Sequence, residues 1–185
     1  ADGERWNPES GVRLSPQQGG AGDFRVVSSE IVPLADGGRL RMYYECCDGT
    51  QSQQNSIRSA ISDDGLRFER EAGVRIAQES ERETSAVYAP EVVRLGDGTY
   101  RMYYAAWTDE ISGGVFTAVS HDGLDWVKEH RPCLDLGGPR DASMVSEPCV
   151  IELADGRSRM FYEARDAAGR CRILSATSAG RPRPV

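Results

Sequence analysis

The chain lacks the features that membrane proteins and nucleic-acid-binding proteins need. No stretch approaches the roughly 20 consecutive apolar residues of a membrane-spanning helix, so we expect no membrane partner. Positive charge is scarce, because 22 Lys and Arg residues face 29 Asp and Glu residues and leave a formal net charge of −7. A negative field repels phosphate backbones, so we expect no nucleic-acid partner.

Metal-ligand and cofactor motifs are missing too. His121 and His130 have no metal-ligand neighbours, the five cysteines lack metal-ligand spacing, and no glycine-rich phosphate loop is present. We therefore expect no metal and no cofactor. The polar residues 1–13 do not resemble a signal peptide, and idle thiols fit a reducing compartment, so we expect a cytoplasmic protein. A secretion signal cleaved before Ala1 would leave no trace.

What the sequence does contain is a threefold internal repeat. An Asp-Gly turn followed by an Arg-Met-aromatic-aromatic strand occurs three times, and the Arg-Met pairs begin at residues 41, 101 and 159. Each copy is preceded by a short apolar run and followed by a strand ending in Ser-Ala-x-Ser or a close variant. In the first two copies a second Asp-Gly turn then leads to a fourth strand. Asp-Gly between apolar runs is a strong hairpin signal, and helical periodicity with caps is lacking.

Four short antiparallel strands in each unit of about 60 residues are typical of a β-propeller blade. We predict an all-β fold, in which a single propeller domain over residues 1–185 comprises three four-stranded antiparallel blades. The units cover about residues 24–76, 86–134 and 144–178, and residues 1–14 belong to the last of them.

The N-terminal segment is assigned to the last blade because that unit lacks its own fourth strand. Residues 2–14 align without a gap on residues 64–76, so the N-terminal strand is predicted to complete the last blade. Three blades are fewer than the usual four to eight. Three interpretations stay open: a homodimer with six blades, possibly formed by exchange of the N-terminal strand, a compact three-blade toroid, and part of a longer propeller.

Three glutamates are the candidate catalytic residues: Glu30, Glu91 and Glu147. Each stands near the start of the first strand of its unit, and in a propeller these strands line the central channel. Converging carboxylates repel one another, so at least one should have a raised pKa. A neutral acid beside an ionised carboxylate is what glycoside hydrolysis needs. The same glutamates could instead cap strand ends or pair with arginines.

The ends of the second strands and the starts of the third strands should meet at the same mouth of the channel. An aromatic side chain among acids and arginines suits a polyhydroxylated ligand, because it stacks while the others form hydrogen bonds. The candidate binding residues are Glu45, Trp107, Glu163, Arg165, Arg58 and Arg172.

The motifs resemble those of the five-bladed β-propeller glycoside hydrolases, which include the arabinanase and xylosidase, invertase, and mannoside-phosphorylase-like groups. The resemblance rests on Pro90-Glu91-Val92-Val93, the Arg-Met-Tyr-Tyr strands and the Ser-x-Asp-Gly-Leu-x-Trp turn. It implies that Glu30 is the base, Glu91 a helper that tunes pKa, and Glu147 the acid. The family usually has aspartates at the first two positions, so the spacing of the carboxyl groups differs here.

The resulting expectation is a glycosidase-like enzyme that acts on a carbohydrate or another small hydroxylated molecule. Two alternatives stay open. One is a lectin-like propeller that binds carbohydrate without catalysis, and the other is a propeller that binds protein partners.

Overall fold

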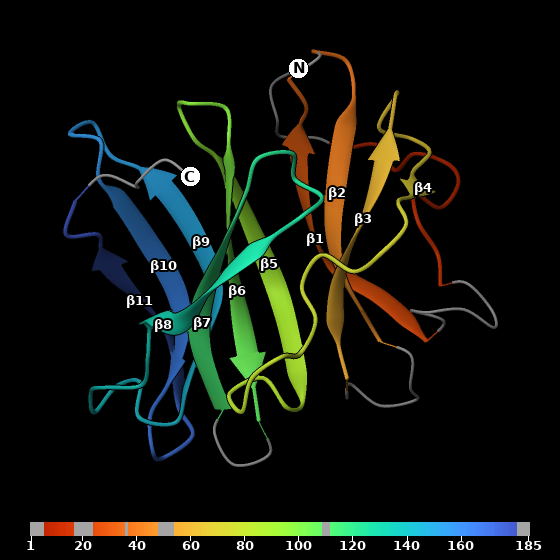
Figure 1. Ribbon diagram of the computed structural model, residues 1–185. Coiled ribbons are helices and arrows are strands. Elements are labelled where there is room, and N and C mark those ends of the chain that lie inside the picture. The colour runs from red at the N-terminus through yellow and green to blue at the C-terminus, as the bar shows by residue number, and fades with distance from the viewer. Residues whose placement is uncertain (1–5, 17–23, 36, 48–53, 109–111, 181–185) are drawn as a thin grey trace.

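The computed structural model describes residues 6–16, 24–35, 37–47, 54–108 and 112–180. This part of the chain contains three antiparallel sheets and no helix, which confirms the all-β prediction (Figure 1). Accordingly, none of the described residues forms a helix able to cross a membrane. The number of blades stays a prediction, and so does the formation of a dimer.

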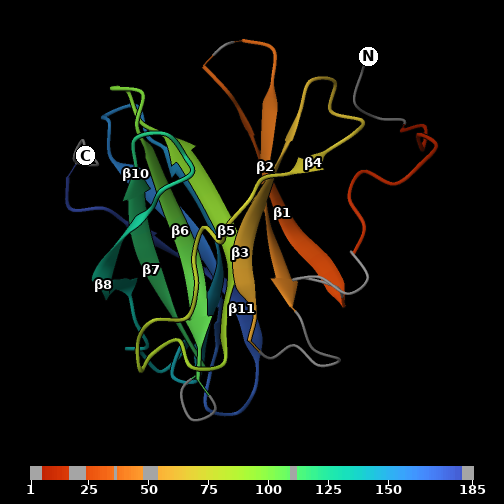
Figure 2. The same cartoon turned by 45° about the vertical axis from the view of Figure 1, so that its right-hand side comes forward.

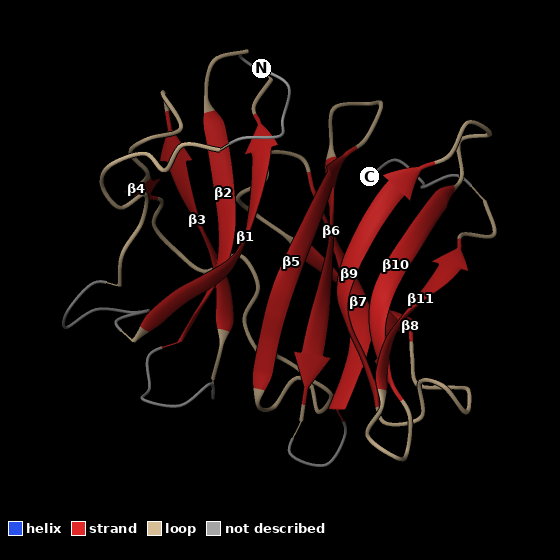
Figure 3. Cartoon of the chain, turned by 180° about the vertical axis from the view of Figure 1, so that it is seen from behind, coloured by secondary structure: helices blue, strands red, loops and turns tan. Residues whose placement is uncertain are grey.

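Each sheet is built from strands that follow one another along the chain. The first sheet contains β1 (Arg25–Pro33), β2 (Leu40–Cys47), β3 (Ser56–Ser62) and β4 (Glu69–Arg70). The second contains β5 (Ala86–Arg94), β6 (Tyr100–Trp107), β7 (Ser112–Ser120) and β8 (Val127–Leu134). The third contains β9 (Met144–Glu152), β10 (Ser158–Arg165) and β11 (Cys171–Thr177). Figures 2 and 3 show the first sheet on one side of the molecule, with the second and third sheets overlapping on the other side.

The repeated Asp-Gly turns explain the hairpins. Gly37, Gly98 and Gly156 have φ values of 77°, 89° and 79°, a left-handed conformation that glycine adopts without steric cost. Their amides donate hydrogen bonds to the carbonyl oxygens of Leu34, Leu95 and Leu153, which close the turns. These hairpins give β1, β5 and β9 equivalent places, and we call these three strands the inner strands.

The sheets pack face to face through apolar side chains. Tyr43 and Ile57 of the first sheet share one core with Met102 and Tyr104 of the second. A second core joins Val115 of β7 to Val145, Met160, Tyr162 and Ala164 of the third sheet. Inner strand β1 also lies beside β5, and β5 lies beside β9. The packing therefore holds the three inner strands next to one another.

The predicted completion of the third sheet by the N-terminal segment is wrong for the described residues of this chain. The Phe68 amide donates a hydrogen bond of 3.4 Å to the Arg13 carbonyl oxygen, and Leu14 packs against Met42 and Tyr44 of the first sheet. The physical reason is apolar burial, because among the described residues no other sheet covers this face of the first sheet and Leu14 packs there instead. Residues 1–5 of the predicted strand lie outside the described part of the chain.

Candidate functional site

Each inner strand has a bulge at the same place. The register shifts between Val27 and Glu30 on β1, between Tyr88 and Glu91 on β5, and opposite Phe161 and Glu163 on β9. At these bulges Ser28, Ala89 and Glu147 have φ values of 50°, 49° and 48°, although none is glycine. Non-glycine residues in this region are strained, and such bulges are frequent next to active sites.

Glu30 and Glu91 follow the first two bulges and line one groove together with Val92 and Val150. Burial and the negative charge of Glu91 raise the pKa of Glu30 to about 7. Burial also raises the pKa of Glu91, although the Val150 amide opposes this by donating a hydrogen bond of 2.8 Å to its Oε1 atom. The two carboxyl groups therefore form a pair in which Glu30 holds its proton up to neutral pH.

Cys149 occupies the equivalent place on the third inner strand, because it lies opposite Phe161 as Glu30 lies opposite Tyr43 and Glu91 opposite Tyr103. Burial, followed by the charges of Glu91 and Glu30, raises the pKa of its thiol. The charges of Glu30 and Glu91 thus act on the third equivalent position, although the three residues are far apart in the chain.

Glu147 lies on the third bulge itself and belongs to a second acidic group. Partial burial, then the charges of Glu45 and Glu163, raise its pKa. Burial is the main cause that raises the pKa of Tyr88 to about 12, and a hydrogen bond with Ser146 opposes it. The charges of the same three carboxyl groups also raise this pKa. These residues lie at the starting ends of the inner strands, and we call this end of the molecule the mouth.

Glu45 is held in place from two sides. Its Oε1 atom accepts hydrogen bonds of 2.5 Å from Arg25 Nη2 and from Asn55 Nδ2, and its side chain is buried. Within the described part of the chain, Arg25 Nε and Asn55 Oδ1 are buried without a hydrogen-bond partner.

An aromatic platform stands beside these acids. Trp107 is 39% exposed, and its ring centroid lies 6.3 Å from that of Tyr88, with 43° between the planes. Exposed aromatic rings next to hydrogen-bonding groups suit the apolar faces and hydroxyl groups of a sugar.

The three predicted arginines lie in different surroundings. Arg165 Nε donates to Ser143 Oγ at 3.2 Å. Arg172 pairs with Asp166 at 2.7 Å, which lowers the pKa of Asp166 to about 2. Arg58 lies opposite Tyr44 in the register, and its charge acts on the Tyr44 hydroxyl. Arg58 is thus on the face of the first sheet that Leu14 covers, away from Glu45.

The structure therefore brings the predicted residues together in two groups, with Glu30 and Glu91 in the groove and Glu147, Glu45 and Glu163 at the mouth. Sequence reasoning missed Tyr88, Arg25 and Asn55. Tyr88 had one available signal, because it directly precedes the Ala-Pro-Glu run at the start of β5. Among the described residues, no group of three or more His, Cys, Asp or Glu side chains is arranged to hold a metal ion.

No family model matches the sequence of this chain. An uncharacterized protein of Mycobacterium tuberculosis strain CDC 1551 is 39% identical over 131 residues, which cover 68% of this chain and 42% of that protein. Its counterpart in strain H37Rv is 38% identical over the same length. The chain therefore spans less than half the length of the curated relatives it matches.

Solved structures show the fold. A glycoside hydrolase aligns with a TM-score of 0.68 and 22% identity over 88% of this chain and 50% of its own. A thermostable family-43 glycoside hydrolase aligns with a TM-score of 0.66 and 15% identity. The alignment covers 89% of this chain and 52% of that protein. A member of the GH130 family aligns with a TM-score of 0.65 and 15% identity over 88% of this chain and 55% of its own. That family is described as mannoside phosphorylases containing glycoside hydrolases that target β-1,2 mannosidic linkages in Candida mannan. The chain has a propeller-like glycoside hydrolase fold, which confirms the resemblance at the level of fold.

Proposed function

We propose that this protein carries out acid/base chemistry on a carbohydrate or a closely related hydroxylated molecule, as a glycoside hydrolase does. The observation that carries the proposal is the Glu30 and Glu91 pair, which the inner strands hold in one groove. A fold alone does not imply an activity, so the argument rests on the site.

The proposed roles follow from the environments of the carboxyl groups. A general base works best when its pKa lies near the working pH, and the pKa of Glu30 is raised to about 7. Glu91 is the tuning residue, because its charge contributes to that shift and the Val150 amide fixes its position. Glu147 is the acid, because partial desolvation and the charges of two neighbouring carboxylates favour its protonated form, while its exposed side chain stays within reach of a substrate.

The mouth provides the binding groups in this proposal. Trp107 and Tyr88 stack on the sugar ring, and Glu45 and Glu163 accept hydrogen bonds from its hydroxyl groups. In the third sheet, Arg165 lies opposite Met144 at the start of β9 and is available to a longer substrate, whereas Arg172 is already paired with Asp166. Arg58 has no role here, because it faces the covered side of the first sheet.

The test is hydrolysis and phosphorolysis of xylo-, arabino- and manno-oligosaccharides and aryl glycosides by the purified chain, with and without phosphate. Glu30→Gln is expected to lower turnover of any accepted substrate by at least about 100-fold, because the base is lost. Glu152→Gln is the matched control, since this residue is exposed near the other end of β9. Wild-type turnover by Glu30→Gln would overturn the proposed role.

Carbohydrate binding without catalysis is the second candidate function, and the exposed Trp107 beside Tyr88 favours it. Arg165 and Cys47 occupy the places equivalent to Trp107 in the other two sheets. This predicts one binding site at the mouth, not a pocket repeated between blades. Calorimetric binding of a sugar that is never turned over would distinguish this function from the first.

A further inference from the structure

Tyr88 stands at a level of the mouth to which each inner strand contributes one residue. Three pairs across the strands are equivalent: Val27 with Glu45, Tyr88 with Ala105, and Ser146 with Glu163. The first and third sheets therefore each provide a carboxyl group here, and the second sheet provides a phenol. Because β5 lies beside both β2 and β9, Tyr88 has the first sheet on one side and the third sheet on the other.

The hydroxyl of Tyr88 keeps a proton that it can donate. Burial is the main cause that raises its pKa to about 12, so the phenol is protonated at neutral pH. Its hydrogen bond with Ser146 opposes this rise, as expected where the buried serine hydroxyl donates to the phenol oxygen. The ring lies against Trp107, with centroids 6.3 Å apart. The ring is thus held in place, and the phenol proton is left for a separate acceptor.

Glu147 is the acceptor that its surroundings favour. Among the carboxyl groups whose charges act on the Tyr88 hydroxyl, Glu147 has the largest effect, ahead of Glu45 and Glu163. Glu147 directly follows Ser146 in the chain, and its side chain is exposed. Glu45, by contrast, is buried and already accepts two hydrogen bonds on its Oε1 atom. The phenol proton is therefore best placed to serve Glu147.

We propose that Tyr88 is a positioning residue whose hydroxyl donates a hydrogen bond to the Glu147 carboxylate once Glu147 has given its proton to the leaving oxygen. Glu147 loses its proton in that step and Tyr88 keeps its own, so the ionised acid is stabilised without a second proton transfer. This inference rests on the proposed role of Glu147 as the acid. The same hydrogen bond should form when Glu147 ionises in the free protein, so it can be tested without a substrate.

The sign of the effect follows from the groups around Glu147. Besides Tyr88, the charged groups at this level of the mouth are Glu45 with its partner Arg25, Glu163, and Arg165 opposite the start of β9. Burial, followed by the charges of Glu45 and Glu163, raises the pKa of Glu147. A hydrogen bond from the Tyr88 hydroxyl acts in the opposite direction, because it favours the ionised form. Removal of the hydroxyl should therefore raise the pKa of Glu147 further.

The first test is a pH titration of Glu147 by NMR in protein with ¹³C-labelled glutamate side chains. Tyr88→Phe removes the hydroxyl and keeps the ring beside Trp107. The midpoint of Glu147 is expected to rise by at least about 0.5 pH unit, the size of one modest hydrogen bond. Ser146→Ala should raise it by less, because the phenol then loses the hydrogen bond that orients it.

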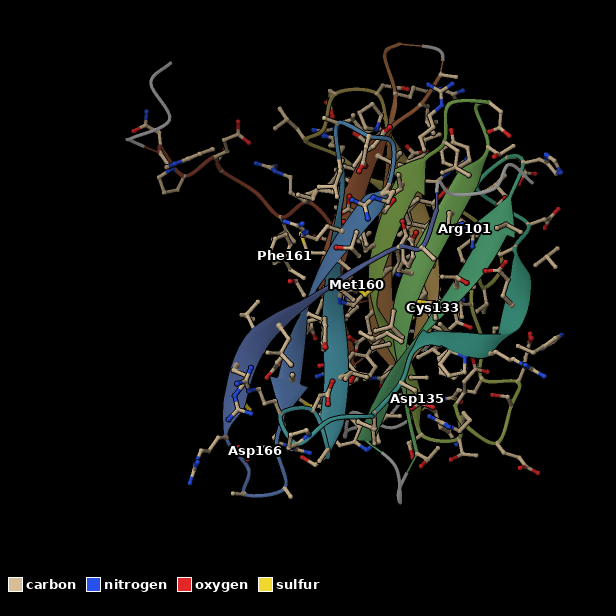
Figure 4. All side chains as sticks on the ribbon, turned by 90° about the vertical axis from the view of Figure 1, so that its left-hand side faces the viewer. Arg101, Cys133, Asp135, Met160, Phe161 and Asp166 are labelled. Carbon is tan, nitrogen blue, oxygen red and sulfur yellow. The ribbon has the colours of Figure 1, made fainter. Side chains whose placement is uncertain are left out.

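Tyr103→Phe is the matched control, because it removes a hydroxyl group from a tyrosine at another place. Tyr103 lies opposite Glu91 in the register, away from the mouth. It is grouped with Arg101, Cys133 and Met160, which Figure 4 labels on the second and third sheets. The midpoint of Glu147 in this variant should equal that of the wild type.

The second test is the pH profile of turnover on an accepted substrate. Tyr88→Phe is expected to lower kcat about tenfold with little change in KM, and to move the basic limb of the profile to higher pH, because that limb reports the pKa of the acid. A Glu147 midpoint that is unchanged or lower in Tyr88→Phe, or a pH profile equal to that of the wild type, would overturn the inference. A raised midpoint in a chain that turns over no substrate would support the contact, although the proposed function would then fail.

Discussion

Glu147→Gln is expected to reduce turnover of an accepted substrate by at least about 100-fold while leaving the fold as stable as the wild type or more so at pH 8. Turnover falls because glutamine cannot donate the proton that the leaving oxygen needs. Stability is kept because Glu147 is close to the carboxyl groups of Glu45 and Glu163, and its ionised form is repelled by both. Steady-state kinetics and thermal unfolding at pH 8 measure the two effects separately.

The sign of the stability effect follows from the raised pKa of Glu147. Its protonated form is favoured in the folded state, so its contribution to stability is greatest at low pH and is lost as the carboxyl group ionises. The difference between Glu147→Gln and wild type should therefore grow as pH rises. A variant that turns over substrate normally, or that is less stable than wild type at pH 8, would contradict the assigned role.

Gly113→Ala is expected to lower the free energy of unfolding by about 3 kcal/mol. Gly113 has a φ of 101°, and a Cβ atom there would lie 2.4 Å from the Val145 carbonyl oxygen and 2.8 Å from its nitrogen. Both are backbone atoms of inner strand β9, two residues before Glu147, so no side chain can move to relieve the clash. Urea unfolding at pH 7 provides the measurement.

Gly169→Ala is the matched control for this substitution. Gly169 has a comparable φ of 81°, but no atom lies within 4 Å of a Cβ placed there. Gly169→Ala should therefore lower the free energy of unfolding by only about 1 kcal/mol, which is the cost of a left-handed backbone for alanine. Equal costs for the two substitutions would show that β7 does not press against β9 as the structure has it.

The repeat made the sheets predictable. The spacing of the Asp-Gly turns, and the aromatic strands after them, indicated antiparallel hairpins, and β1 to β3, β5 to β7 and β9 to β11 form such sets. The second Asp-Gly turn, before residues 69–70 and 127–134, marked the outer strands of the first two sheets. Local turn chemistry and alternating side chains suffice for these features because they depend on near neighbours.

The place of the N-terminal segment could not be predicted in the same way. Residues 2–14 match the outer strand of the first unit, yet the described part of the segment lies beside that unit's own outer residues, near Phe68. Similarity to a strand shows what a segment can pair with, but not which of several equivalent edges it reaches. Within one chain, the segment lies on the first sheet because Leu14 buries its side chain against the apolar face around Tyr44.

The site was predictable in part. Glu30 and Glu91 were found from their equivalent places before the Asp-Gly turns, and the structure puts them in one groove. The division into a groove and a mouth was not foreseen, because it depends on the bulges. Ser28, Ala89 and Glu147 are not glycines, so nothing in the sequence marks their left-handed backbone.

The inner strands hold the carboxyl groups of Glu30 and Glu91 in one partly buried groove, where they do not both ionise at mildly acidic pH. The most direct test is a pH titration of Glu30 by NMR in protein with ¹³C-labelled glutamate side chains. We expect a midpoint of about 7 for Glu30, compared with the ordinary value of 4.5. We also expect a lower midpoint in Glu91→Gln, because the neighbouring charge is removed while burial remains. A wild-type midpoint near 4.5, or one that does not move in Glu91→Gln, would show that the two carboxyl groups are not paired in this way.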